Sequence, residues 1–75
     1  MPFVEVKSIQ GVFSKEEKAR IIEETTSIYA RMKGDDFAAG TWVVVTEVEN
    51  GGWGEGGAVL LKENVPDDQE RQSTG

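Results

Sequence analysis

The sequence MPFVEV, residues 1–6, opens the chain. The prediction of the fold depends on this stretch more than on any other. Valines alternate with larger or charged side chains behind Pro2, a pattern that predicts a strand over residues 2–9. A proline nitrogen inside a chain has no N–H. If Met1 is removed, however, Pro2 has a free secondary amine that can take a proton or attack a carbonyl. The alternative is a proline that merely starts a strand and has no chemical role.

The length and composition predict a small domain that associates with copies of itself. The chain has 75 residues, no cysteine and no histidine. Disulfides are therefore excluded, and the usual ligands of a structural zinc are absent, so no metal site is expected. A core of this size rarely supplies more than roughly 3–5 kcal/mol, which leaves homo-oligomerisation as the expected source of further stability.

The charge balance disfavours a nucleic-acid partner. Fourteen acidic and eight basic residues give a formal net charge of −6, which phosphate backbones repel. No apolar run approaches the roughly 20 residues of a membrane span. The N-terminus has neither the basic nor the apolar region of a signal peptide, so we expect a cytoplasmic protein with no membrane partner.

A helix is predicted over residues 15–33. Ser14 and Glu17 form a capping-box pattern at its start, and Gly34 is suited to the position after its last turn. At 1.5 Å per residue the helix is about 28 Å long, enough to cross back over a short sheet. Its apolar stripe is expected to face the sheet, with charged residues such as Lys18 on the other faces. The stripe comprises Ile21, Ile22, Thr25, Ile28, Tyr29 and Met32.

The second strand is predicted in the sequence TWVVVTEV, residues 41–48, after a loop over residues 34–40. Its nearly continuous β-branched run predicts burial on both faces. A strand, a crossover helix and a second strand form a βαβ unit with parallel strands and a right-handed connection. The fold class is therefore α/β.

The glycine-rich stretch over residues 49–57 predicts a turn or hairpin, with Asn50-Gly51 as the turn dipeptide. It lacks the Gly-Lys-Ser/Thr sequence of a phosphate-binding loop. Trp53, flanked by glycines, is expected to pack as a lid or to project into a neighbouring subunit. Residues 58–61 are compatible with a further short strand or turn, and the polar sequence beyond Pro66 predicts a disordered tail.

Taken together, MPFVEV, Gly11 before a capped helix, TWVVVTEV and GGWGEGG resemble the 4-oxalocrotonate tautomerase family. The resemblance covers roughly residues 2–62, which we take as a tautomerase-like domain over 1–62 and a polar tail over 63–75. It implies a βαβ unit with a C-terminal hairpin, pairing of two chains into a four-stranded sheet, and assembly of dimers into a hexamer. It also implies removal of the initiator methionine, keto–enol tautomerisation of a small 2-oxo acid with the N-terminal proline as general base, and no cofactor.

The resemblance assigns site roles to three positions and shows that two arginines usual in the family are replaced here. Pro2 matches the catalytic proline, Trp53 the aromatic pocket residue of the hairpin, and Ile9 an apolar wall residue. Val12 and Trp42 stand where the family usually has arginines that hold the substrate carboxylate and polarise its carbonyl. Neither side chain can form a bidentate pair with a carboxylate.

The predicted pocket is therefore apolar, with Pro2 as the base. Its remaining members are Phe3, Ile9, Val12, Trp42 and Trp53. Desolvation in such a pocket still favours a neutral amine. The expected substrate is less charged or aromatic, such as an enol of the phenylpyruvate type, and activity on dicarboxylate dienols is expected to be weak.

Two further questions stay open from the sequence. Lys7, Arg20 or Arg31 is a possible substitute for the missing arginines, although the helical arginines fit a solvated face. Glu47 is a candidate for a pair across a subunit boundary, with no catalytic role. The alternative to an enzyme is a non-catalytic relative that binds a small ligand or acts only in assembly.

Overall fold

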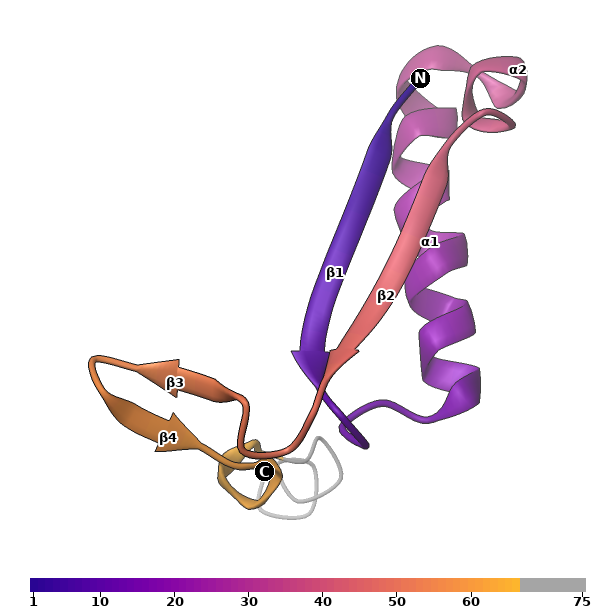
Figure 1. Cartoon of the computed structure of the whole chain (residues 1–75). Coiled ribbons are helices and arrows are strands. Elements are labelled where there is room, and N and C mark those ends of the chain that lie inside the picture. Colours follow the sequence, from indigo (N-terminus) through magenta and orange to yellow (C-terminus); the bar gives the residue numbers. More distant parts are fainter. Residues whose placement is uncertain (67–75) are drawn as a thin grey trace.

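The computed structural model describes residues 1–66, and its elements follow the predicted βαβ-plus-hairpin order (Figure 1). The elements are β1 (Phe3–Ile9), α1 (Lys15–Lys33), α2 (Asp35–Ala38), β2 (Trp42–Val48), β3 (Trp53–Glu55), β4 (Ala58–Leu60) and a 3-10 turn, η1 (Lys62–Asn64). Residues 63 and 64 of the predicted tail thus belong to η1. The predicted disorder beyond Pro66 lies outside the described residues.

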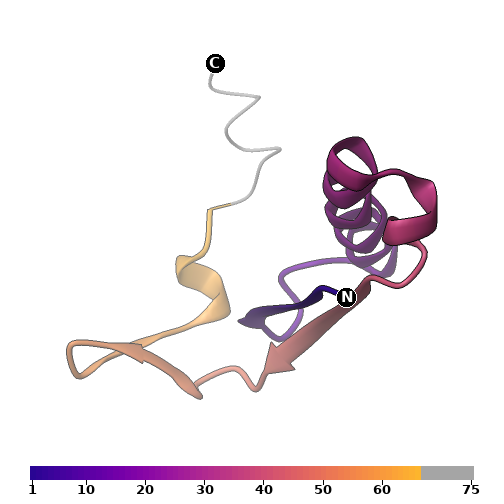
Figure 2. The ribbon, with the colours of Figure 1, turned by 90° about the horizontal axis from the view of Figure 1, so that it is seen from above.

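The centre of the fold is a two-stranded parallel sheet. β1 pairs with β2 in a register that runs from Phe3 opposite Trp42 to Ile9 opposite Val48. Because side chains alternate along a strand, the valines at positions 4, 6, 43 and 45 share one face of this sheet. Helix α1 covers one side of the sheet (Figure 2), and the half-buried valines belong to that covered face.

The prediction that β2 is buried on both faces is wrong for this chain. Trp42 and Val44 lie on the face opposite α1 and are exposed. An unbroken apolar run indicates a covering layer on each face of a strand. Within residues 1–66, α1 supplies that layer on one face and no element does so along the whole of the other.

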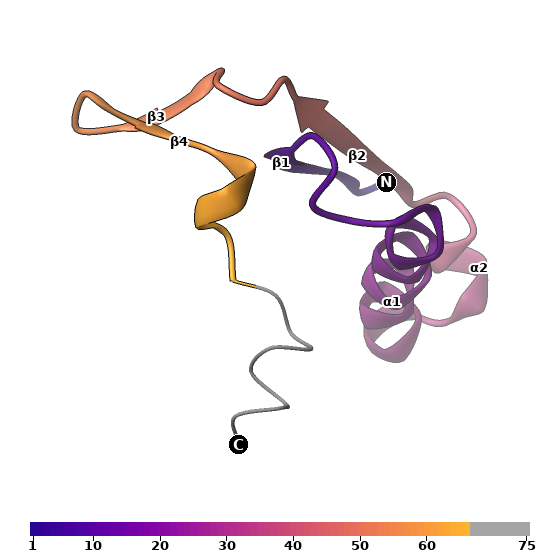
Figure 3. The same cartoon turned by 90° about the horizontal axis from the view of Figure 1, so that it is seen from below.

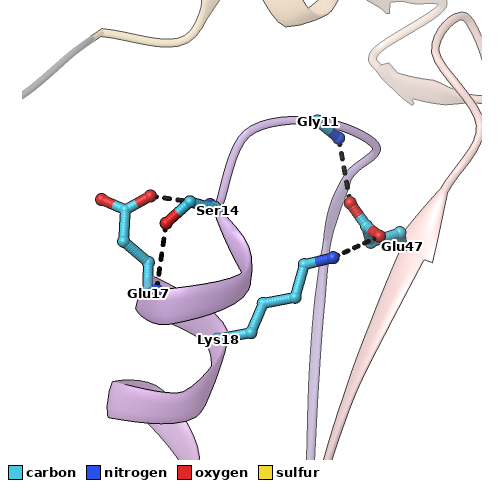
Figure 4. A network of polar contacts seen from close by, with 5 residues as sticks. All are labelled: Gly11, Ser14, Glu17, Lys18 and Glu47. Carbon is cyan, nitrogen blue, oxygen red and sulfur yellow. Dashed lines mark hydrogen bonds and ion pairs between the residues drawn. The ribbon is translucent and has the colours of Figure 1, made fainter.

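Helix α1 has the predicted ends. The Ser14 hydroxyl accepts a hydrogen bond from the Glu17 amide at 3.1 Å, and the Glu17 carboxylate accepts one from the Ser14 amide at 2.8 Å (Figure 4). At the other end Gly34 has a φ of 94° and its N–H donates to the Ala30 carbonyl at 2.8 Å. A left-handed φ favours glycine, so the helix stops here as expected.

A polar contact ties α1 to β2 at the end of the sheet where β1 finishes. Lys18 Nζ lies 2.6 Å from Glu47 Oε1, and the Gly11 amide donates to Glu47 Oε2 at 2.9 Å (Figure 4). The prediction that Lys18 lies on a face away from the sheet is therefore wrong, and Glu47 has its ion-pair partner within its own chain. The long Lys18 stem can cover apolar surface while its ammonium reaches the carboxylate, which a simple apolar stripe does not capture.

The segment over residues 34–40 contains a short helix where a loop was predicted. α2 spans Asp35–Ala38, and its two aspartates occupy the first turn, where negative charge stabilises the helix dipole. Ala38 is buried, and the Thr41 amide donates to its carbonyl at 2.9 Å. This turn of helix leads the chain directly into β2.

The apolar surface of the chain is only partly covered by the chain itself. Among residues 1–66, the buried apolar side chains are those of Ile9 and Ala38. Of the predicted α1 stripe, Ile21, Thr25 and Tyr29 are half-buried. Its other members, Ile22, Ile28 and Met32, are exposed. A small domain with so little buried surface has few means of stabilising itself alone.

The hairpin is confirmed, but its turn lies elsewhere than predicted. Strands β3 and β4 are joined by Gly56-Gly57, whose φ values of 58° and 89° suit a two-residue hairpin turn. Asn50-Gly51 instead forms a separate turn, closed by the Gly52 amide donating to the Glu49 carbonyl at 2.8 Å. The hairpin extends away from α1 and the sheet (Figures 1 and 3).

Candidate active site

Pro2 lies at the end of the sheet where both parallel strands begin. It is half-buried, and its carbonyl accepts a hydrogen bond from the Trp42 amide at 3.0 Å. Phe3 and Trp42 are register partners on the face away from α1, with 64% and 65% of their surfaces exposed. The structure therefore joins the backbone of Pro2 to the start of β2, next to a pair of uncovered aromatic residues in the register.

Met1 lies close to this end of the sheet. Its thioether lies against Gly40, where any Cβ would collide with it. While Met1 is attached, the Pro2 nitrogen is an amide with no basic lone pair. The chemistry predicted for Pro2 therefore depends on the removal of Met1.

A cavity of about 360 Å³ lies at the opposite end of β1. Its walls are mainly apolar and come from β1, the segment that follows β1, the hairpin and η1. The apolar lining residues are Ile9, Val12, Phe13, Trp53, Leu60, Leu61 and Val65. Three of the six predicted site residues, Ile9, Val12 and Trp53, therefore surround one space.

The other three predicted site residues lie too far away to share this cavity within one chain. Seven residue steps separate Pro2 from Ile9, which at the usual strand rise corresponds to about 23 Å. Figure 1 shows the separation: the N-terminus lies at one end of the β1–β2 sheet, and the hairpin leaves from the other. A single chain thus carries two half-sites: the Pro2 end, with Phe3 and Trp42, and the cavity end, with Ile9, Val12 and Trp53.

Lys7 is the basic residue among those that line the cavity. It lies on the wall of the cavity, and its Nζ is 3.4 Å from Glu5 Oε2. Thr46 Oγ1 also donates to Glu5 Oε2, at 2.8 Å. The Thr46 hydrogen bond and, after it, the nearby Lys7 ammonium lower the pKa of Glu5. By contrast Arg20 pairs with Glu24 on the exposed face of α1, as expected of a solvated arginine.

Sequence reasoning missed the contribution of η1. Asn64 joins Val65 on the cavity wall, and Asn64 Oδ1 accepts from the Leu61 amide at 3.0 Å. Lys62 packs on Gly11: a Cβ at Gly11 would lie 3.3 Å from Lys62 Nζ. The apolar residues that follow the hairpin were the available signal that the chain turns back toward β1.

Ser8 is a second polar group of the wall. Its hydroxyl oxygen is buried and has no hydrogen-bond partner within residues 1–66. Across this same part of the chain, no group of acidic side chains is arranged to hold a metal ion. No helix among the described residues is long and apolar enough to cross a membrane.

A family model described as tautomerase enzyme matches residues 2–63, which is most of the chain. The chain belongs to the tautomerase family. The resemblance to 4-oxalocrotonate tautomerase noted in the sequence is thereby confirmed. No curated protein sequence matches the chain.

Three solved structures, two of them of 4-oxalocrotonate tautomerase homologues, have a similar fold. DmpI from Helicobacter pylori is 25% identical, with a TM-score of 0.65, and the match covers 77% of this chain and 94% of DmpI. A 4-oxalocrotonate tautomerase homologue is 20% identical at a TM-score of 0.65, over 89% of this chain and all of its own. YwhB, another such homologue, is 20% identical at 0.64, over 87% of this chain and all of its own.

Proposed function

We propose that this tautomerase-family protein catalyses keto–enol proton transfer on a small 2-oxo acid, with Pro2 as the general base after Met1 is removed. Two observations support the proposal. The family match begins at residue 2, so it includes Pro2 and omits Met1. Pro2 also directly precedes β1, and its carbonyl accepts a hydrogen bond from the Trp42 amide, which ties this residue to the start of β2.

The chemical step needs one proton and no cofactor. In the enol-to-keto direction the Pro2 amine accepts the enol O–H proton and leaves an enolate, whose oxygen electron pair forms the carbonyl as the carbon–carbon π pair is protonated. The carbon–carbon π pair then takes the same proton from the prolinium at the neighbouring carbon, which restores the free amine. Once a second chain covers Phe3 and Trp42, desolvation favours the neutral amine, so Pro2 is expected to act near neutral pH.

The substrate is expected to be an aromatic or weakly charged acid. Val12 and Trp42 carry no guanidinium, so neither forms the bidentate carboxylate pair that a dicarboxylate dienol would use at both ends. Trp42 has one indole N–H donor. Apolar side chains dominate the cavity wall, which suits an aryl group better than a second carboxylate.

We further propose that the two half-sites meet when two chains pair. β1 has β2 as its only strand partner among residues 1–66, so its other edge is open. Two β1 edges related by a twofold axis run antiparallel. If both helices lie on the same side of the joint sheet, each odd-numbered residue of one β1 lies opposite an odd-numbered residue of the other, and each even-numbered residue opposite an even-numbered one. A pairing centred on Glu5 or Val6 brings Pro2 of the partner subunit opposite residues 8–10, beside the cavity.

This arrangement also fits the exposed apolar surface of α1 and the projecting hairpin. An isolated two-stranded hairpin is marginal in water, and the exposed Ile22, Ile28 and Met32 lack a covering layer in one chain. Assembly of paired chains into a hexamer would supply such layers. Size-exclusion chromatography with light scattering measures the assembly directly, and a stable monomer at low micromolar concentration would exclude it.

The test of the base is the ketonisation of phenylpyruvate enol by native protein and Pro2→Ala, after intact mass has shown whether Met1 is absent. Loss of the base is expected to lower kcat about 10²–10⁴-fold. Pro66→Ala is the matched control, since Pro66 is the chain's other proline, and it should retain native kcat. Equal rates for native protein and Pro2→Ala would exclude Pro2 from the mechanism.

The missing guanidinium groups favour one alternative, a non-catalytic protein that keeps the cavity for an apolar ligand. A reagent directed at basic proline, such as 3-bromopropiolate, separates the two functions. Rapid modification of Pro2 together with turnover supports the enzyme. Slow modification without turnover of any aromatic enol supports the binding protein.

A further inference from the structure

We propose that Lys7 is the carboxylate-binding residue of the cavity and makes it selective for aryl monocarboxylates. The proposal deepens the proposed function, because the bound acid would be the substrate whose enol meets the Pro2 amine. In it, the Lys7 ammonium on β1 makes the contact with the ligand carboxylate that Val12 and Trp42 cannot make.

The position of Lys7 follows from the strand. Residues i and i+2 of a strand share a face, so Lys7 and Ile9 both lie on the sheet face away from α1. The same cavity is lined by Lys7, Ile9, Val12 and Trp53. When the Lys7 ammonium turns from Glu5 toward the cavity, a carboxylate bound to it leaves the remainder of the ligand beside apolar walls.

Lys7 is available for a ligand because its existing ion pair is exposed. The side chains of Lys7 and Glu5 are 57% and 39% exposed, and pairs of this kind contribute little to stability. Thr46 holds the Glu5 carboxylate at 2.8 Å without help from Lys7. The Lys7 stem is flexible, so its ammonium can turn from Glu5 to a ligand at low cost.

The other nearby lysines are less suited to this role. Lys18 lies 2.6 Å from Glu47, whose second oxygen accepts from the Gly11 amide, so it is part of the contact between α1 and β2. Lys62 packs on the backbone at Gly11 and is not part of the cavity wall. Of the three, Lys7 is the one on the wall itself.

The surroundings define the ligand chemistry. A cavity of about 360 Å³ is at the small end of ligand sites and suits a compact molecule. One ammonium pairs with one carboxylate, and the Glu5 carboxylate beside it repels a second. The Trp53 ring and the neighbouring leucines favour an aryl group. The occupant expected is an aryl-substituted monocarboxylate.

The experiment measures binding apart from catalysis. The probe is 3-phenylpropionate, which carries the carboxylate and ring but has no enol, titrated calorimetrically into native protein, Lys7→Met, Lys7→Arg and Glu5→Gln. A lost charge-assisted contact corresponds to about a tenfold or greater rise in Kd for Lys7→Met. Lys7→Arg should recover most of the affinity, and Glu5→Gln should bind more tightly than native protein. Lys33→Met removes the same charge at the end of α1 and should bind as native protein does.

The same variants are then compared in turnover. For phenylpyruvate enol, Lys7→Met should raise KM by the factor found for Kd, while Lys33→Met should keep the native KM. Equal Kd values for Lys7→Met and Lys33→Met would overturn the proposal. Binding that depends on Lys7 in a protein without turnover would uphold this proposal and defeat the proposed function.

Discussion

The two ends of the β1–β2 sheet differ in what one chain provides. The cavity end has a buried side chain, an apolar wall drawn from four segments and a nearby ammonium. The Pro2 end has the candidate base but leaves Phe3 and Trp42 uncovered. One end has a pocket without a base, and the other has a base without a pocket. Because the base and the pocket lie at opposite ends of one chain, the catalytic unit proposed for this protein is larger than one chain.

The largest effect on stability is expected at the cavity end. Ile9 is 6% exposed, and Ile9→Ala removes buried methyl groups, which should lower the free energy of unfolding by roughly 2–4 kcal/mol. Phe3→Ala at the other end is the comparison, since one chain leaves Phe3 mostly exposed. Denaturant unfolding measures both variants.

A loss below about 0.5 kcal/mol for Ile9→Ala, the range of ordinary surface changes, would contradict the burial assigned to it. An equal loss of unfolding free energy in Ile9→Ala and Phe3→Ala would change the interpretation of the two ends. It would mean that association covers Phe3, so that the contrast between the ends belongs to the single chain alone.

A smaller effect is expected from the contact that fixes the cavity end to α1. The Lys18 ammonium and, after it, the Gly11 amide lower the pKa of Glu47. A carboxyl with a depressed folded pKa stabilises above its unfolded value of about 4.3, and that contribution is lost as pH falls through the folded pKa. At pH 7 the native protein should therefore have a higher melting temperature than Glu47→Gln, and this difference in melting temperature should shrink below about pH 4.

Thermal unfolding monitored by circular dichroism between pH 7 and pH 3 gives this comparison. Glu24→Gln is the control, because its pair with Arg20 is exposed and should matter little at any pH. A Glu47→Gln melting difference that stays constant across this range would show that the carboxylate charge is not the stabilising feature.

Much of the fold was predictable because local rules sufficed. Alternation around Val4 and Val6 gave β1, the Ser14–Glu17 pattern fixed the start of α1, and Gly34 marked its end. These features depend on residues close in sequence. The errors arose where distant residues decide the outcome: the Lys18–Glu47 contact joins positions 29 apart, and the uncovered face of β2 reflects a missing layer.

The candidate site was predictable in its residue types but not in its arrangement. The resemblance assigned Pro2, Ile9 and Trp53 to one pocket, whereas a strand about 23 Å long separates the first from the other two. No rule based on spacing indicated that η1 returns to the cavity. The sequence offers Lys7 as one of three candidate cations, and its place on the wall emerges only when the strand, hairpin and η1 are seen together.

The central claim, that the half-sites come from different chains, is tested most directly by complementation. Pro2→Ala keeps the cavity and Trp53→Ala keeps the base, so each alone should be nearly inactive. The two variants are mixed in equal amounts in denaturant and refolded together. Half of the resulting twofold pairs contain one chain of each variant, and each such mixed pair has one intact site out of two. The mixture should therefore recover about a quarter of native activity. Recovery near that value is what the account predicts. A mixture no more active than its two components, despite mixed pairs detected by native mass spectrometry, would contradict it.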